Sequence, residues 1–177
     1  MNKQSKINIF FVISIFSITA LYFIYNANVK DDEVYFTPSM DCKIKIIQAI
    51  NSSKHTLNIA VYSITNKEIV EAIILANNRG VRVTVLTDFV QSRGRASKVD
   101  FLKNSGIEVL IIKGKTMHNK FSIFDNKVIQ TGSYNYTNNA NKRNYENCFF
   151  TKKKNIIFEF KKEFDLMREK GMAFNDY

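Results

Sequence analysis

The sequence predicts an α/β domain in which a mixed β-sheet is flanked by helices. Strand-like and helix-like segments alternate through the first half of the chain, which favours parallel strand pairing with helices on the sheet faces. Two more strands follow around an Asp-Asn turn and indicate a hairpin, so the sheet should also contain antiparallel pairs. Apolar residues make up 45% of the 177 residues and fall in blocks, which excludes a disordered chain.

Each predicted element depends on the spacing of its apolar residues and on the residues that bound it. Clean alternation predicts a strand at 81–88, whereas apolar positions three and four apart predict a helix at 66–80. Asn66 can cap this helix and Gly80 can end it. In chain order we expect a strand at 34–38, a helix at 41–54, a strand at 56–64, a helix at 66–80, a strand at 81–88, a helix at 96–106, a strand at 107–112, a hairpin of strands 120–125 and 127–133, a strand at 146–151 and a helix at 154–171.

The N-terminal segment differs from the rest of the chain. Residues 7–29 carry no charge and follow Lys3 and Lys6. This length can cross a bilayer. The pattern also resembles a secretory signal, although the small residues needed for cleavage are poorly placed. We therefore predict that residues 1–29 are a signal-anchor or signal peptide, with an uncleaved membrane anchor favoured. The lysines in front favour bacterial-type export of the domain, either periplasmic or secreted.

The charge balance points to an anionic partner. Lys and Arg number 26 against 16 Asp and Glu, for a net charge of +10. Nucleic acid and an anionic lipid surface both fit this balance, and a merely solubilising surface is the alternative.

The two cysteines, Cys42 and Cys148, lie far apart and match no metal-binding spacing. Because only two histidines could join them, we expect no structural metal. A disulfide would need an oxidising compartment, and the sequence leaves that pairing open.

One stretch, MHNKFSIFDNKVIQTGSYNYT, concentrates residue types that handle phosphate. His118 and Lys120 would share one face of a strand. A neutral imidazole can attack phosphorus, and an ammonium can stabilise the charge that builds on the non-bridging oxygens. Chance co-occurrence in a hairpin is the alternative, but the combined spacing is too restrictive to favour it. The residues with this spacing are His118, Lys120, Asp125, Gly132, Ser133 and Asn135.

The remaining members of this set have supporting roles. Gly132 would let backbone approach closely. Ser133 and Asn135 would offer uncharged donors to phosphate oxygens. Asp125 is best interpreted as an orienting or structural carboxylate.

The stretch resembles the HxKxxxxD and GSxN signature (the HKD motif) of the phospholipase D superfamily. The flanking segments NIAVYSITNKEIVEAIILANNRGVRVTVLTD and ENCFF resemble its small single-motif branch, which includes Nuc-type endonucleases and mitochondrial cardiolipin hydrolase. The resemblance implies a phospholipase D-like sandwich and makes 30–177 the catalytic domain. It also implies phosphodiester cleavage without a metal or cofactor. Larger members carry the motif twice, so a single copy implies a homodimer with one shared site.

The resemblance also implies roles for individual residues. His118 would form a covalent phosphohistidine while the partner's His118 protonates the leaving oxygen. Lys120, Ser133 and Asn135 would bind the phosphate, and Asp125 belongs to the motif's catalytic set. Glu146 matches the acid that holds the histidine ring, although a surface ion pair would be an ordinary role for it.

The motif alone does not identify the substrate. We expect an endonuclease that cleaves DNA or RNA. The alternative is a phospholipase D that acts on phosphatidylcholine or cardiolipin, and a non-catalytic nucleic-acid-binding module is a distant third. Basic loops near the motif favour a polyanion, whereas a membrane anchor would favour lipid. Tyr134 could stack on a base or pack in the core. The candidate groove residues are Arg93, Arg95, Lys98, Lys115 and Tyr134.

Overall fold

The computed structural model describes residues 3–28 and 32–173. The chain divides into two compact units, Met1–Asp31 and Asp32–Tyr177. In the first unit, α1 spans Lys3–Asn28. Among the described residues, no helix combines the length and the apolar character needed to span a membrane. The prediction of a membrane anchor at residues 7–29 is therefore not supported by the structure.

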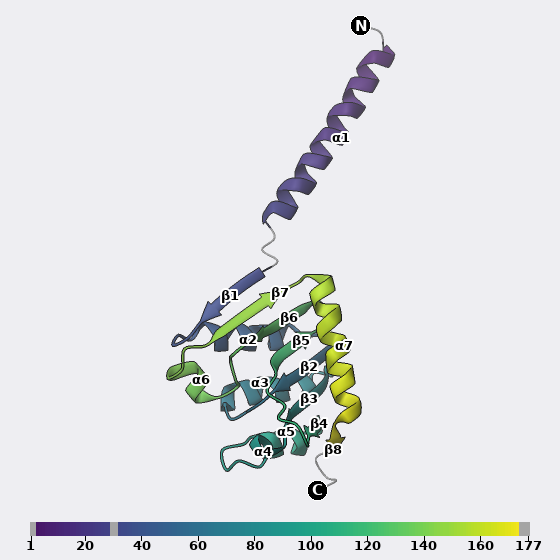
Figure 1. Cartoon of the computed structure of the whole chain (residues 1–177). Coiled ribbons are helices and arrows are strands. Elements are labelled where there is room, and N and C mark those ends of the chain that lie inside the picture. Colours follow the sequence, from purple (N-terminus) through teal and green to yellow (C-terminus); the bar gives the residue numbers. More distant parts are fainter. Residues whose placement is uncertain (1–2, 29–31, 174–177) are drawn as a thin grey trace. The chain divides into compact units, whose positions relative to one another are not determined.

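The second unit contains an eight-stranded sheet with the order β1-β7-β6-β5-β2-β3-β4-β8 (Figure 1). Two neighbouring pairs, β2 with β3 and β3 with β4, are parallel, and the other pairs are antiparallel. The sheet is therefore mixed, as predicted. Its strands are β1 (Asp32–Phe36), β2 (Thr56–Val61), β3 (Arg82–Asp88), β4 (Glu108–Ile112), β5 (Lys120–Phe124), β6 (Val128–Gly132), β7 (Asn147–Thr151) and β8 (Met172–Ala173).

Helices cover both faces of this sheet, and each face has its own apolar core. One core includes Ile46, Ile73 and Val85, which belong to α2, α3 and the sheet. The other packs α7 on the sheet through Ile157 and Phe164. The second unit is thus the predicted sandwich. Its helices are α2 (Asp41–Ser52), α3 (Lys67–Asn78), α4 (Phe89–Ser92), α5 (Val99–Asn104), α6 (Asn138–Lys142) and α7 (Lys154–Lys170).

Two local predictions are confirmed in detail. Asn66 caps α3, because its side chain accepts a hydrogen bond from the Ile69 N–H. The β5–β6 hairpin turns at Asp125 and Asn126, both with φ of 52°. Positive φ at both central residues is typical of the tight hairpin turns that Asn and Asp favour.

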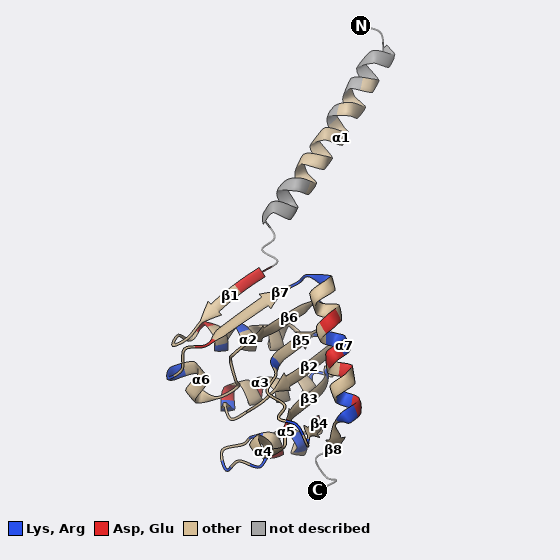
Figure 2. Ribbon diagram, viewed as in Figure 1, with Lys and Arg blue, Asp and Glu red and all other residues tan. Residues whose placement is uncertain are grey.

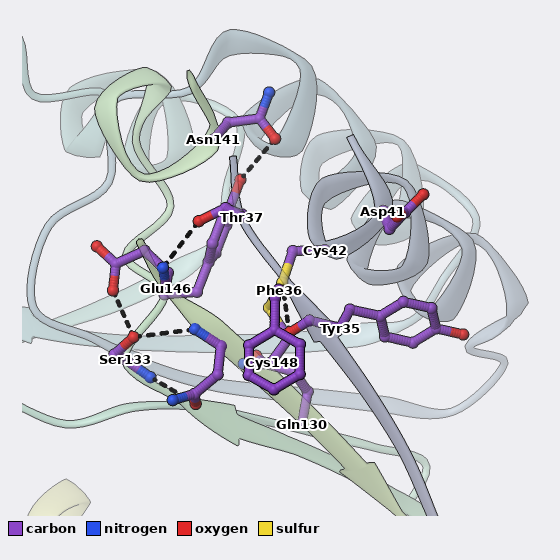
Figure 3. Close-up of a disulfide and its surroundings, with 12 residues drawn as sticks. Tyr35, Phe36, Thr37, Asp41, Cys42, Gln130, Ser133, Asn141, Glu146 and Cys148 are labelled. Carbon is purple, nitrogen blue, oxygen red and sulfur yellow. Dashed lines mark hydrogen bonds between the residues drawn. A yellow bond between two sulfur atoms is a disulfide. The ribbon is translucent and has the colours of Figure 1, made fainter. Parts of the chain in front are cut away.

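A disulfide joins Cys42 of α2 to Cys148 of β7 (Figure 3). Both residues are fully buried, and their Cα atoms lie 5.8 Å apart. The structure thus answers the pairing that the sequence left open. The bond holds α2 against β7, the strand that pairs with the outermost strand β1.

Candidate active site

The strand register brings four strand ends to one edge of the sheet. Val61 at the end of β2 lies opposite Lys120 at the start of β5. Phe121 lies opposite Thr131, so the start of β5 also meets the end of β6. Gly132 at that end pairs with Cys148, near the start of β7. The motif residues before β5 and after β6 therefore share this edge, which we call the motif edge.

His118 and Lys120 differ in their surroundings although one residue separates them. His118 precedes β5 and is exposed, whereas Lys120 begins the strand and is only 8% exposed. The Lys120 Nζ atom donates a hydrogen bond to the His118 carbonyl oxygen at 2.5 Å. The His118 ring packs edge-on against Tyr62, with ring centroids 4.6 Å apart. An exposed imidazole beside a buried ammonium can reach a ligand in solvent.

Burial lowers the pKa of Lys120 below its ordinary value, and attraction to the Glu146 carboxylate opposes this shift. Desolvation disfavours the ammonium, so Lys120 is a cation held where water is scarce. Such a site strengthens its interaction with an anionic group. A phosphate bound at His118 would offset this cost, because it would place negative charge beside the Lys120 ammonium.

The segment after β6 is tied to the start of β7 (Figure 3). The Ser133 hydroxyl donates to the Glu146 carboxylate and accepts the Asn147 N–H at 3.1 Å. Gly132 has φ of 149°, and a Cβ there would lie 2.2 Å from the Asn147 carbonyl oxygen. The prediction that Gly132 allows close backbone approach is confirmed. This contact places Ser133 at the motif edge.

Glu146 is bound differently from the expectation. Its carboxylate accepts hydrogen bonds from Ser133 and from Asn144 Nδ2 at 2.8 Å, and its backbone is paired with Thr37. Among the described residues, it makes no hydrogen bond to His118. Glu146 still acts on the motif through its attraction to Lys120.

The side chain of Asn135 reaches the end of β2, whereas that of Tyr134 lies in the core. The Asn135 Oδ1 atom accepts the Ser63 N–H at 3.2 Å, which ties the segment after β6 to the end of β2. Tyr134 is fully buried, and its hydroxyl donates to Asn141. A buried ring cannot stack on a base, so Tyr134 is a core residue and is removed from the groove.

Asp125 lies at the opposite end of β5 from Lys120. Its carboxylate accepts the N–H groups of Lys54, His55 and Thr56 at 2.7–2.9 Å. Burial works to raise the pKa of Asp125, but these N–H donors outweigh it, so the pKa lies below its ordinary value. The structure does not bring Asp125 together with His118. Asp125 binds the backbone that leads into β2.

The basic groove candidates lie on segments between helices and strands. The Arg93 guanidinium lies over the ring of Phe89, the residue that follows β3, at 4.4 Å from its centroid. The Lys98 N–H donates to the Ile64 carbonyl, just beyond the end of β2. Figure 2 shows basic residues in the loop after α4 and at the end of α6, whereas α7 mixes both signs. Arg95 and Lys115 are exposed in connecting loops.

Sequence reasoning missed Tyr62 and Gln91. Tyr62 contacts the His118 ring, and Gln91 Nε2 donates to the Tyr62 hydroxyl at 3.0 Å. The motif gives no signal for either residue. The one available signal was position, since Tyr62 directly follows a buried strand at its carboxyl end.

Comparison with known proteins explains this combination of motif and fold. The family model described as "Cardiolipin synthase, PLD-like domain" matches residues 46–168. The chain belongs to the phospholipase D superfamily. Its relatives place it in the small single-motif branch. The sandwich described above is the phospholipase D-like fold.

Individual relatives agree with this assignment. The chain is 33% identical over 122 residues to a mitochondrial cardiolipin hydrolase of Chlamydomonas reinhardtii, covering 68% of this chain. It is 37% identical over 114 residues to a phospholipase D of Rickettsia prowazekii, covering 63% of this chain. Each alignment spans 55% of the relative's length.

A solved structure is also similar to this chain. Nuc of Salmonella typhimurium, a phospholipase D family member, is similar with a TM-score of 0.77 and 28% identity. The alignment covers 81% of this chain and 97% of that one. The neighbour is therefore matched over nearly all of its length.

Proposed function

We propose that this protein is a phosphodiester hydrolase that works through a phosphohistidine, without a metal ion. The observation that carries the proposal is the motif edge, where exposed His118 stands beside the buried cation of Lys120. The superfamily membership supports it, because the relatives include a phospholipase D and a cardiolipin hydrolase. Glu146, Ser133 and Asn135 lie on segments held at the same edge.

The proposed reaction has two steps. One imidazole nitrogen of His118 bonds to phosphorus as the bond to the leaving oxygen breaks, and the partner subunit's His118 protonates that oxygen. Water then attacks phosphorus, the partner's imidazole takes its proton, and the phosphorus–nitrogen bond breaks. Lys120 stabilises the non-bridging oxygens in both transition states. Ser133 and Asn135 hold the phosphate, with Glu146 close to Lys120.

This scheme needs two histidines, and each chain carries one motif. We therefore propose a homodimer in which two motif edges meet across a two-fold axis. The mass of the protein in solution tests this directly, because a monomer would lack the second imidazole.

We propose nucleic acid as the substrate and endonuclease cleavage as the activity. Support comes from the +10 charge, the basic loop after α4 and the match to nearly all of Nuc. The second candidate is a phospholipase D acting on phosphatidylcholine or cardiolipin, which the names of the sequence relatives favour. Asp125 is proposed to serve the fold, because its carboxylate is bound to backbone away from the motif edge.

We also propose export to an oxidising compartment. The Cys42–Cys148 disulfide supports this location, because such bonds persist outside the reducing cytosol. Residues 1–29 would then act as the export signal.

The test compares the full chain with His118→Ala in excess EDTA. Each protein receives plasmid DNA, RNA, and vesicles of phosphatidylcholine or cardiolipin. EDTA-resistant cleavage of DNA or RNA that the variant loses supports the nuclease. Release of head group with nucleic acids intact supports the phospholipase. If the variant cleaves a substrate as fast as the wild type does, catalysis by His118 is refuted.

A further inference from the structure

The ring of Tyr62 lies beside both cationic groups of the motif edge. Its centroid is 4.6 Å from that of the His118 imidazole, with the planes at 60°. The Lys120 Nζ atom lies 5.2 Å from the same ring. Strand pairing causes this placement, because Val61, the residue before Tyr62, is the register partner of Lys120.

Tyr62 is itself held at three points. Its N–H donates to the Asn119 carbonyl at 3.0 Å, and its carbonyl accepts the Thr87 hydroxyl at 3.2 Å. Its phenol oxygen accepts Gln91 Nε2 at 3.0 Å. The first bond ties Tyr62 to the residue between His118 and Lys120. The ring therefore has a defined position relative to both motif side chains.

The segment that carries Gln91 is also anchored by hydrogen bonds. The Asp88 carboxylate accepts the Val90 and Gln91 N–H groups at the start of α4. Its second oxygen accepts the Met117 N–H at 3.1 Å. Asp88 is only 4% exposed, so these bonds are shielded from water. One buried carboxylate thus links the support of Tyr62 to the residue before His118.

His118 needs such a support. Its side chain is exposed, and among the described residues its ring makes no hydrogen bond. A nucleophile that rotates freely spends little time at the angle of attack, and a displacement of about 1 Å can cost about 100-fold in rate. An aromatic ring can restrain an imidazole edge-on and also attract an ammonium over its face.

We propose that Tyr62 is a positioning residue that orients the His118 imidazole and holds the Lys120 ammonium beside it. The inference rests on the proposed function for its effect on rate. The ring performs this role, and the hydroxyl bond to Gln91 only refines its position. Tyr62→Leu should therefore lose the activity that Tyr62→Phe keeps.

The test uses the full chain with Tyr62→Leu and the matched Tyr62→Phe. The substrate is bis(p-nitrophenyl) phosphate, which has one phosphate and needs no groove. We expect Tyr62→Leu to lower kcat about 100-fold with KM changed less than about 3-fold. Tyr62→Phe should stay within about 3-fold of the wild type. A kcat for Tyr62→Leu within 3-fold of the wild type, or equal losses in both variants, would overturn the proposal.

A second readout does not depend on activity. The chain has two histidines, so proton NMR can follow the ring signals of His118 with His55 as the internal reference. His118→Ala assigns the signals. Tyr62→Leu should remove the ring-current displacement of the His118 signals and leave those of His55 unchanged, whereas Tyr62→Phe should keep both. Unchanged His118 signals in Tyr62→Leu would refute positioning even if the enzyme were inactive, and an inactive wild type with displaced signals would refute only the proposed function.

Discussion

The two ends of β5 carry the motif's charged residues in opposite ways. At the start, Lys120 is buried and burial lowers its pKa. At the far end, N–H donors from three residues outweigh burial and lower the pKa of Asp125. A lowered pKa disfavours the charged form of lysine and favours that of aspartate. Burial of the charged Lys120 therefore lowers the stability of the folded state, whereas the charged Asp125 raises it.

This difference separates two functions that the sequence motif joins. The cost at Lys120 is what a bound phosphate can relieve, as expected for a binding site. The stability at Asp125 holds the backbone entering β2 and needs no ligand. Substitutions at the two ends should therefore change different measurements.

The largest effect is expected from Lys120→Met, which keeps much of the length and removes the charge. We expect kcat to fall about 1,000-fold, or about 4 kcal/mol, because a preorganised cation is lost. The free energy of unfolding should stay equal or rise, since a buried charge is replaced by an apolar group. Kinetics and urea unfolding at pH 7 measure the two effects. A protein that loses stability in proportion to activity would contradict the comparison.

The next effect is expected from Gly132→Ala, at the strand end beside Lys120. The new Cβ would meet the Asn147 carbonyl oxygen at 2.2 Å, and φ of 149° suits glycine. We expect a loss of about 3 kcal/mol in unfolding free energy, together with lower activity, as β6 and β7 move apart. Gly94→Ala is the control, because its Cβ would meet only Gln91 oxygen at 3.4 Å. Equal thermal midpoints for the two variants would argue against the close contact.

Asp125→Asn tests the other end of β5. Asparagine tolerates the φ of 52°, so the change removes mainly the charge on an acceptor of three N–H groups. We expect a loss of about 2 kcal/mol in unfolding free energy, with kcat of the folded protein unchanged. Asp165→Asn in α7 is the control, because its half-exposed carboxylate makes only an i,i+4 ion pair with Lys161 among the described residues, and the loss there should be below about 1 kcal/mol.

The Asp125 effect also has a defined pH dependence. Its pKa in the folded state lies below the ordinary 3.8, so its contribution is full above that value. The contribution is lost as pH falls through the folded-state pKa. The stability difference between wild type and Asp125→Asn should therefore be present at pH 7 and shrink below pH 3.8. A difference as large at pH 2 as at pH 7 would mean that the charge is not its cause.

The smallest effect is expected from Ser133→Ala. The variant loses the hydroxyl that joins Glu146 and the Asn147 N–H. We expect kcat to fall about 10-fold, or about 1.4 kcal/mol, with a smaller change in stability. Activity on bis(p-nitrophenyl) phosphate is the measurement. A loss as large as that of Lys120→Met would mean that Ser133 does more than hold phosphate.

Most of the fold could be predicted because its elements carry clear periodic patterns. The helix expected at 154–171 is found at Lys154–Lys170, and the strand expected at 81–88 is found at Arg82–Asp88. The short helices α4 and α6 were missed, since four or five residues are too few to show a period. Pairing of β1 with β7 was also invisible, because strands far apart in sequence leave no local signal of their partner.

The candidate site was predictable only where chemistry and sequence spacing coincide. His118, Lys120, Ser133 and Asn135 share the motif edge because a hairpin brings its two open ends together. Asp125 sits at the closed end of that hairpin, where spacing alone cannot reveal its separate role. Tyr62 follows a different strand, β2, and Tyr134 is buried by packing that its neighbours in sequence do not specify.

The pairing of early and late segments also affects how the chain is made. Cys42 is synthesised 106 residues before Cys148, and β1 is complete long before its partner β7 exists. At about 5–20 residues per second, roughly 5–20 s separate the two cysteines during translation. Throughout that interval Cys42 is an unpaired thiol, open to the wrong partner. A ribosome-bound chain truncated before Cys148 should therefore be trapped by thiol reagents that the finished protein resists.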